Sequence, residues 1–232
     1  MSIHRLLTVG FALLTAHANA ATVFSGTYSW GSDGNVPSFP YNGTGIALLT
    51  VSDATKNGIN STSNAGNFRA SSWATGATDG GDDFSGSIDL NKYIEFTLTA
   101  AEGHHINMTS ITFGLGRSGT GPRQWEWRSS ADDFSGAINT YSTVNLNLTN
   151  SSGILTTPDS DSSWTGNILD LSSGSHSNLS SITFRLYGYN AEGTQGTGGL
   201  QGDLSFSGTL IPEPSSALLL MLGTAGLLRR KR

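Results

Sequence analysis

The 232-residue chain has no cysteine and few charged residues. Because cysteine is absent, thiol nucleophiles, disulfide bonds, iron–sulfur clusters and cysteine-ligated zinc are excluded. Charged side chains make up 12% of the chain, about half of the roughly 25% typical of globular domains. Helical periodicity is almost missing between residues 21 and 210. The chain has instead 30 glycines and many short stretches in which apolar and polar residues alternate.

The N-terminal segment has the three parts of a secretory signal. Arg5 supplies a positive charge, residues 6–16 form an apolar run, and Ala18-Asn19-Ala20 supplies the small residues that signal peptidase requires. The apolar run is shorter than the roughly 20 residues that cross a bilayer. We therefore predict a signal peptide over residues 1–20, cleaved after Ala20, with a buried first helix as the alternative.

A second targeting segment is predicted over residues 211–232. Pro212-Glu213-Pro214 precedes an apolar stretch at 215–228, and the chain then ends in four cations: Arg229, Arg230, Lys231 and Arg232. With a rise of about 1.5 Å per residue, the apolar stretch would form a short transmembrane helix. The basic end fixes its orientation and places the body across the membrane. The two prolines keep the preceding peptide extended and accessible to a transpeptidase.

The C-terminal arrangement resembles the PEP-CTERM sorting signal of Gram-negative bacteria. The resemblance rests on Pro212-Glu213-Pro214, the apolar stretch and the basic end, together with the predicted signal peptide. It implies processing by a membrane transpeptidase, exosortase, after a transient stay in the inner membrane. It also implies transfer to the cell surface or to the exopolysaccharide matrix. An ordinary single-pass membrane anchor is the alternative.

The stretch between the two targeting segments is acidic. Residues 21–211 carry seven cations and 16 acidic residues, a net charge of −9. Such a surface repels phosphate backbones, so nucleic acid is not an expected partner.

Alternation with a period of two predicts strands between residues 21 and 210. In residues 93–99, for example, Ile94, Phe96 and Leu98 fall on one face. Further candidates are residues 46–51, 110–115, 124–128, 144–149, 168–171, 181–187 and 204–207. Because turn-forming residues separate these strands, we predict an all-β ectodomain, a jelly-roll-like β-sandwich, over residues 21–210.

Two short sequences occur twice. DDFSG stands at 82–86 and 132–136, and SITF stands at 110–113 and 181–184. Because the two offsets differ, the chain has no tandem repeat. We interpret DDFSG as a turn motif in which the phenylalanine enters the core.

No motif nominates a catalytic residue or a cofactor. The glycine-rich sequence at 114–119 matches a dinucleotide fingerprint, but an alternating strand and not a helix follows it, so we predict a hairpin loop. Three histidines remain after signal cleavage: His104, His105 and His176. They are interpreted as solvated turn residues, because adjacent strand residues point to opposite faces and zinc needs convergent ligands.

Pairs of acidic residues could serve two functions. Asp79, Asp82 and Asp132 are weak candidates for a structural Ca²⁺ site, which needs six to eight oxygen ligands; capping of turn amides is the preferred interpretation. A polysaccharide hydrolase or lyase would require two carboxyl groups facing one cleft.

Trp125 and Trp127 are predicted to project from one face of a strand, with Glu126 and Arg128 on the other. If exposed, the two indoles would stack on sugar rings, and Arg128 would bind an anionic group. This carbohydrate-binding module is the alternative function. If the indoles fill the core, as large aromatic side chains usually do, no binding surface is nominated. The preferred hypothesis is a non-enzymatic exported protein of the cell surface or extracellular matrix, associated with exopolysaccharide.

Overall fold

The computed structural model describes residues 20–32, 34–62 and 66–213. Most of the predicted signal peptide, Pro214, the predicted transmembrane helix at 215–228 and the basic end at 229–232 lie outside these residues. In the described part of the chain no helix is long and apolar enough to cross a membrane. Its helical content is one turn of 3₁₀ helix, η1 (Ser130–Asp132).

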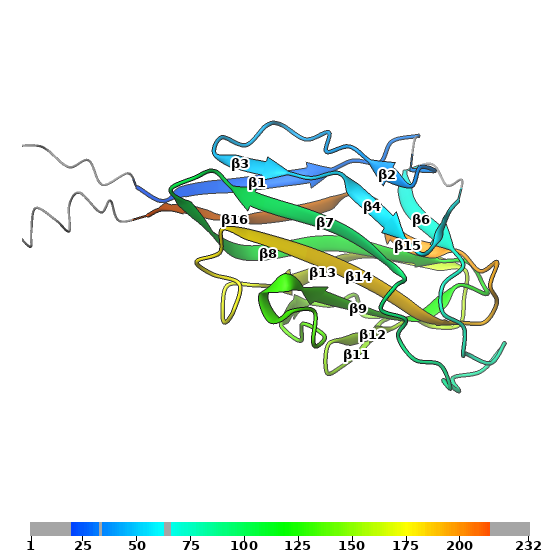
Figure 1. The fold of residues 1–232 in the computed structure, drawn as a ribbon. Helices are drawn as coiled ribbons and strands as arrows, with labels where there is room; N and C mark the ends of the chain where they lie inside the picture. Colours follow the sequence, from blue (N-terminus) through cyan, green and yellow to red (C-terminus); the bar gives the residue numbers. More distant parts are fainter. Residues whose placement is uncertain (1–19, 33, 63–65, 214–232) are drawn as a thin grey trace, which may run out of the picture.

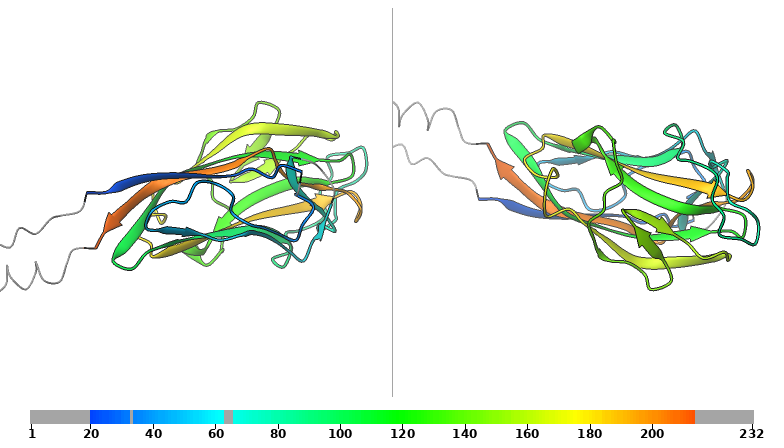
Figure 2. Two further views of the ribbon diagram at one scale, coloured as in Figure 1. Left: turned by 90° about the horizontal axis from the view of Figure 1, so that it is seen from above. Right: turned by 90° about the horizontal axis from the view of Figure 1, so that it is seen from below.

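The strands form two antiparallel sheets of eight strands each, which lie in two layers (Figures 1 and 2). The first sheet contains β1 (Thr22–Tyr28), β5 (Asn60–Ser61), β6 (Asn67–Ser71), β8 (His104–Arg117), β10 (Tyr141–Thr143), β13 (Ser162–Asp170), β15 (Gly198–Gln201) and β16 (Leu204–Pro212). The second contains β2 (Ser38–Phe39), β3 (Leu49–Val51), β4 (Ala54–Asn57), β7 (Tyr93–Ala100), β9 (Pro122–Ser129), β11 (Thr149–Ser151), β12 (Ile154–Thr156) and β14 (Ser181–Ala191). The prediction of an all-β fold with two sheets is confirmed, whereas the jelly-roll connectivity stays a prediction.

The core lies between the sheets and receives every second residue of the long strands. Ile94, Phe96 and Leu98 of β7 are buried, as their alternation predicts. Phe96 meets Trp127 of β9 edge to face, with ring centroids 6.3 Å apart. Trp127 in turn meets Phe113 of β8, in the opposite sheet, at 5.4 Å. These aromatic contacts join the two sheets.

The repeated SITF sequence marks one central strand in each sheet. Its copies lie in β8 and β14, where Ile111 and Phe113, and likewise Ile182 and Phe184, are buried. The intervening threonines are only partly buried. The recurrence therefore records the same strand pattern in two sheets.

One predicted strand, at residues 144–149, is wrong over most of its length. Leu146 is fully exposed, although the alternation would bury it. The Asn145 side chain accepts a hydrogen bond from the amide of Asn147 at 3.1 Å. This Asx turn closes the chain locally and removes the residues from a ladder.

The first and last strands are neighbours. β1 pairs with β16, with Thr22 opposite Leu210. Ala20 is exposed and lies just before β1. The beginning of β1 and the end of β16 therefore leave the body at the same end (Figure 2).

Candidate functional site

The hairpin between β8 and β9 places two arginines at the end of the body opposite to Thr22 and Pro212 (Figure 1). β8 ends at Arg117, and β9 carries Arg123 as its second residue. Residues 114–117 of the glycine-rich sequence lie in β8 and not in the predicted hairpin loop, which begins only after Arg117.

Arg117 is fully buried and lies among acceptors from three segments. Its Nη2 donates to Glu192 Oε1 at 2.6 Å and its Nη1 to Asp159 Oδ1 at 3.2 Å. Nε donates to the carbonyl of Gly121 at 3.2 Å. The side chain of Glu192 is only 1% exposed, so this ion pair is screened little by water.

Arg123 is held as firmly as Arg117. Its Nε donates to the carbonyl of Thr157 at 3.0 Å, and its Nη1 donates to that of Gly81 at 2.7 Å. Nη2 donates to the carboxylate of Asp82. The guanidinium is 1% exposed, whereas the side chain of Asp82 is 84% exposed. The contacts therefore tie the loop that contains Asp82 to β9.

The pKa values of the two carboxyl groups beside Arg117, Glu192 and Asp159, shift in opposite directions. Burial raises the pKa of Glu192 above its ordinary value, against the opposing effect of Arg117. Burial also acts on Asp159, but the hydrogen bond from Arg117 and the charge of Arg123 outweigh it and lower its pKa. Glu192 Oε2 has no hydrogen-bond partner among the described residues.

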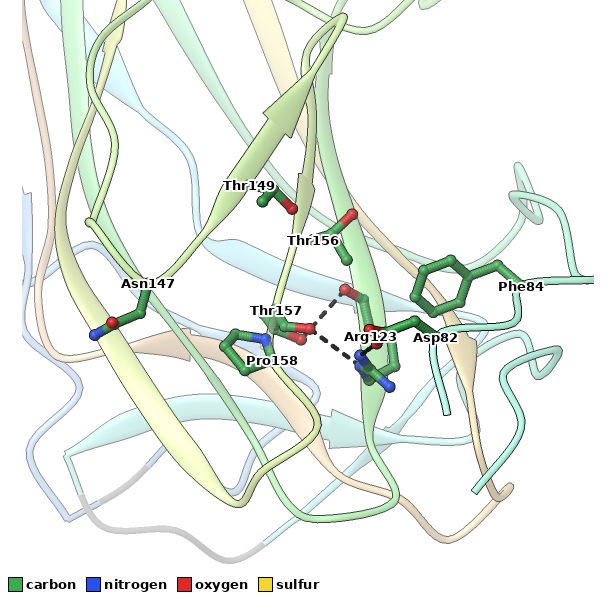
Figure 3. Close-up of a pocket in the computed structure, with 8 residues that line it drawn as sticks. All are labelled: Asp82, Phe84, Arg123, Asn147, Thr149, Thr156, Thr157 and Pro158. Carbon is green, nitrogen blue, oxygen red and sulfur yellow. Dashed lines mark hydrogen bonds and ion pairs between the residues drawn. The ribbon is translucent and has the colours of Figure 1, made fainter. Parts of the chain in front are cut away.

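A pocket of about 360 Å³ opens beside Arg123 (Figure 3). Phe84 and Asp82 approach from one side and Asn147 from the other, with the hydroxyl groups of threonines between them. Its lining residues are Asp82, Phe84, Arg123, Asn147, Thr149, Thr156, Thr157 and Pro158. The Phe84 ring lies 5.3 Å from the Arg123 guanidinium carbon. One aromatic ring and several hydrogen-bonding groups thus surround one space.

The two tryptophans predicted to be candidate glycan-binding residues do not form an exposed binding surface. Trp125 and Trp127 are both fully buried, and Trp125 meets Trp73 edge to face at 5.3 Å. The predicted alternation is correct, because Arg128 lies on the opposite face and donates to Glu126 at 2.5 Å. The exposed tryptophan pair of the carbohydrate-binding alternative is wrong, because a fully buried indole cannot stack on a sugar.

The candidate calcium ligands are not brought together. Asp82 pairs with Arg123, while Asp132 accepts a hydrogen bond from Ser135 Oγ at 2.9 Å. Among residues 20–32, 34–62 and 66–213, no three His, Asp or Glu side chains are placed to hold a metal ion. Asp79, Asp82 and Asp132 therefore do not form one calcium site.

The histidines differ from one another in their surroundings. His176, predicted to be solvated, is buried, and its ring stacks on Phe184 at 6.2 Å. Burial lowers its pKa. His105 lies at the start of β8, with its Nε2 3.1 Å from Glu213 Oε1.

The contact of His105 with Glu213 belongs to a junction that sequence analysis missed. Pro212 pairs with His104 of β8, and the Glu213 amide donates to the Gly103 carbonyl at 2.8 Å. The peptide is extended, as predicted, but it is part of a sheet. The alternation at 204–207 continues to Leu210, which was the available signal that the strand reaches the motif.

The last strand of the two-layered β-domain, β16, thus leads directly into the C-terminal segment that was predicted to be a sorting signal. A family model described as the PEP-CTERM protein-sorting motif matches residues 210–232. The predicted resemblance is confirmed: the chain carries this motif, which is a substrate signal for exosortase and indicates an exported protein sorted at the membrane. No curated protein and no solved structure matches the chain.

Proposed function

We propose that the protein is a non-enzymatic component of the cell surface or exopolysaccharide matrix. A signal peptide at residues 1–20 exports it, and a tail at 211–232 with a transmembrane helix at 215–228 holds it in the inner membrane. An exosortase-type transpeptidase then releases or transfers the body. The observation that carries the proposal is the motif match, which begins at residue 210 inside strand β16.

The arrangement of the acidic groups favours a non-enzymatic function over a polysaccharide hydrolase or lyase. Asp159 and Glu192 both contact the guanidinium of Arg117, but the Glu192 side chain is only 1% exposed. A glycosidase needs two carboxyl groups on either side of a substrate bond, about 5 to 9 Å apart. A carboxyl group buried as deeply as Glu192 does not flank a substrate bond.

Cell fractionation tests the sorting function. The protein should lose its tail and leave the inner membrane, whereas the double variant Pro212→Ala/Pro214→Ala should stay there at its unprocessed size. Pro40→Ala is the matched control, because Pro40 is an exposed proline of the body. Equal size and location for the native chain and the double variant would contradict the proposal.

The junction gives a sharper test of how the motif is presented. Because Pro212 and Glu213 are bound to β8, a transpeptidase must detach them before it can bind them as an extended peptide. His105→Ala removes the partly exposed contact of its Nε2 with Glu213 Oε1, which is worth up to about 1 kcal/mol, so tail removal should accelerate up to about fivefold in a pulse-chase experiment.

His104→Ala is the control for this prediction, because the described contact of the His104 ring is with the Glu102 carbonyl at 3.2 Å. Equal processing rates in the native chain and His105→Ala would show that detachment does not limit sorting.

A further inference from the structure

We propose that the pocket between Phe84 and Arg123 binds one neutral pyranose unit of an extracellular polysaccharide. This inference rests on the proposed function, since that function supplies the polysaccharide. It assigns the aromatic contact to Phe84, in the loop between β6 and β7, and not to the buried tryptophans of β9.

The shape and the lining of the pocket suit a sugar ring. Its volume of about 360 Å³ lies within the range of roughly 300 to 1,000 Å³ of small-molecule sites. A pyranose has C–H groups on its faces and hydroxyl groups around its rim. Phe84 offers an aromatic face, while Asn147, Thr149 and Thr156 offer hydrogen-bond donors and acceptors.

The wall of the pocket is pre-organised. Arg123 is 1% exposed and is fixed by contacts with Thr157, Gly81 and Asp82. A buried ion network of this kind is weak evidence for stability, because desolvation opposes the attraction of the charges. It does hold the Asp82–Phe84 loop against β9 in one geometry, which lowers the entropic cost of binding.

The charges around the pocket favour a neutral ligand. The cations Arg117 and Arg123 already contact Asp82, Asp159 and Glu192. The arginines therefore offer no excess positive charge. Because residues 21–211 carry a net charge of −9, a uronate or sulfated chain would be repelled as it approached.

The position of the pocket leaves it accessible during sorting. β8 runs from His104, beside the sorting motif, to Arg117, beside the pocket network. Its 14 residues span roughly 40 Å. The pocket network thus lies at the opposite end of β8 from the junction with the tail.

The repeated DDFSG sequence provides a matched control. Phe84 lines the pocket, whereas the Phe134 ring packs against Arg185, whose guanidinium carbon lies 3.9 Å from its centroid. Replacing each phenylalanine by alanine removes the same side chain from the same pentapeptide. Only one of the two replacements alters the pocket.

The test is a binding experiment with the full-length chain in a detergent that contains no sugar. Cello-, manno- and galacto-oligosaccharides are titrated calorimetrically, with oligogalacturonate as the anionic comparison. At least one neutral oligosaccharide should bind. Phe84→Ala should weaken its binding at least about fivefold, because a stacking contact is lost, and Phe134→Ala should leave it unchanged.

Thr149→Val serves as a second pocket variant of nearly unchanged volume, because Thr149 is exposed and its loss should not affect folding. It should also weaken binding. The pocket proposal is overturned if the folded native chain binds none of the neutral probes or binds only oligogalacturonate. It is also overturned if Phe84→Ala binds the neutral probes as tightly as the native chain does. Fractionation of Phe84→Ala separates the two proposals, since this variant should be sorted normally whatever it binds.

Discussion

Residues 82–86 and 132–136 share the sequence DDFSG but differ in backbone conformation. In the first copy Phe84 forms a bridge with Ala77 inside the loop between β6 and β7. In the second copy Asp133 and Phe134 have φ values of 57° and 58° and close the turn after η1. The exposure of the side chains nevertheless matches, with both aspartates exposed and the phenylalanine half-buried in each copy.

Each phenylalanine contacts an arginine, which corrects the interpretation that it enters the core. Phe84 lies 5.3 Å from Arg123, and Phe134 lies 3.9 Å from Arg185. The five residues therefore determine which side chains face water. The flanking elements determine the backbone, since one copy lies in a long loop and the other follows β9 directly. Local sequence and tertiary context contribute separately here.

The largest expected difference concerns the two arginines. Arg123→Met leaves the buried Glu192 and the partly buried Asp159 with one cation fewer, which should lower the free energy of unfolding by about 3 to 5 kcal/mol. Arg185→Met breaks an ion pair with Glu95 that is about one-quarter exposed and should cost about 1 to 2 kcal/mol. Urea denaturation measures both values. Equal losses would mean that the two arginines support their phenylalanines in the same way.

Replacing the two phenylalanines should change the stability by amounts that differ less than for the arginines. Here the larger loss is expected in the second DDFSG copy. Phe134 stacks closely on Arg185, so Phe134→Ala should cost about 1 to 2 kcal/mol. Phe84 is farther from its arginine, which polar contacts already hold, so Phe84→Ala should cost less than about 1 kcal/mol. If so, the binding control is the less stable variant, and loss of sugar binding in Phe84→Ala cannot result from unfolding. A larger loss in Phe84→Ala would reverse this comparison.

The fold was easier to predict from the sequence than the site. The spacing of Ile94, Phe96 and Leu98 predicts their strand, because a strand with one buried face buries every second residue. The same pattern placed Trp125 and Trp127 on one face, but a period of two cannot tell which face is covered. The strand predicted at 144–149 failed because the Asn145 side chain competes for the backbone amides, an effect invisible to periodicity.

The site could not be predicted because its parts come from separate segments. Arg117 and Arg123 flank a hairpin, while Asp159 follows β12 and Glu192 follows β14. Nothing in the local sequence of these residues indicates that they meet. The junction at Pro212 depends likewise on pairing with His104, far away in the chain. When side chains are brought together only by the topology of the sheets, no local sequence pattern predicts their contact.

A glycine scan at the second aspartate of each DDFSG copy sharpens the backbone comparison. Asp133 has a φ of 57°, a conformation that glycine adopts without a Cβ clash. Asp133→Gly should therefore leave the stability unchanged or raise it slightly, whereas Asp83→Gly should lower it by about 0.5 to 1 kcal/mol. Thermal unfolding of the two variants gives the comparison. A loss of the same size at both positions would show that the two copies do not differ in backbone strain.

The smallest expected effect is a change of stability with pH, which arises from the carboxyl groups beside Arg117 and Arg123. Because burial raises the pKa of Glu192, its contribution to stability is complete below its ordinary value of about 4.3 and is lost as the pH rises through the raised value. Asp159, whose pKa is lowered, has the opposite sign: its contribution is present above its ordinary value and is lost on acidification. Glu192→Gln mimics the protonated group, so the melting temperature of the native chain should fall relative to that of Glu192→Gln as the pH rises above the ordinary pKa of a glutamate. A native chain whose advantage over Glu192→Gln grows as the pH rises would mean that the ionised form of Glu192 is the one stabilised beside Arg117.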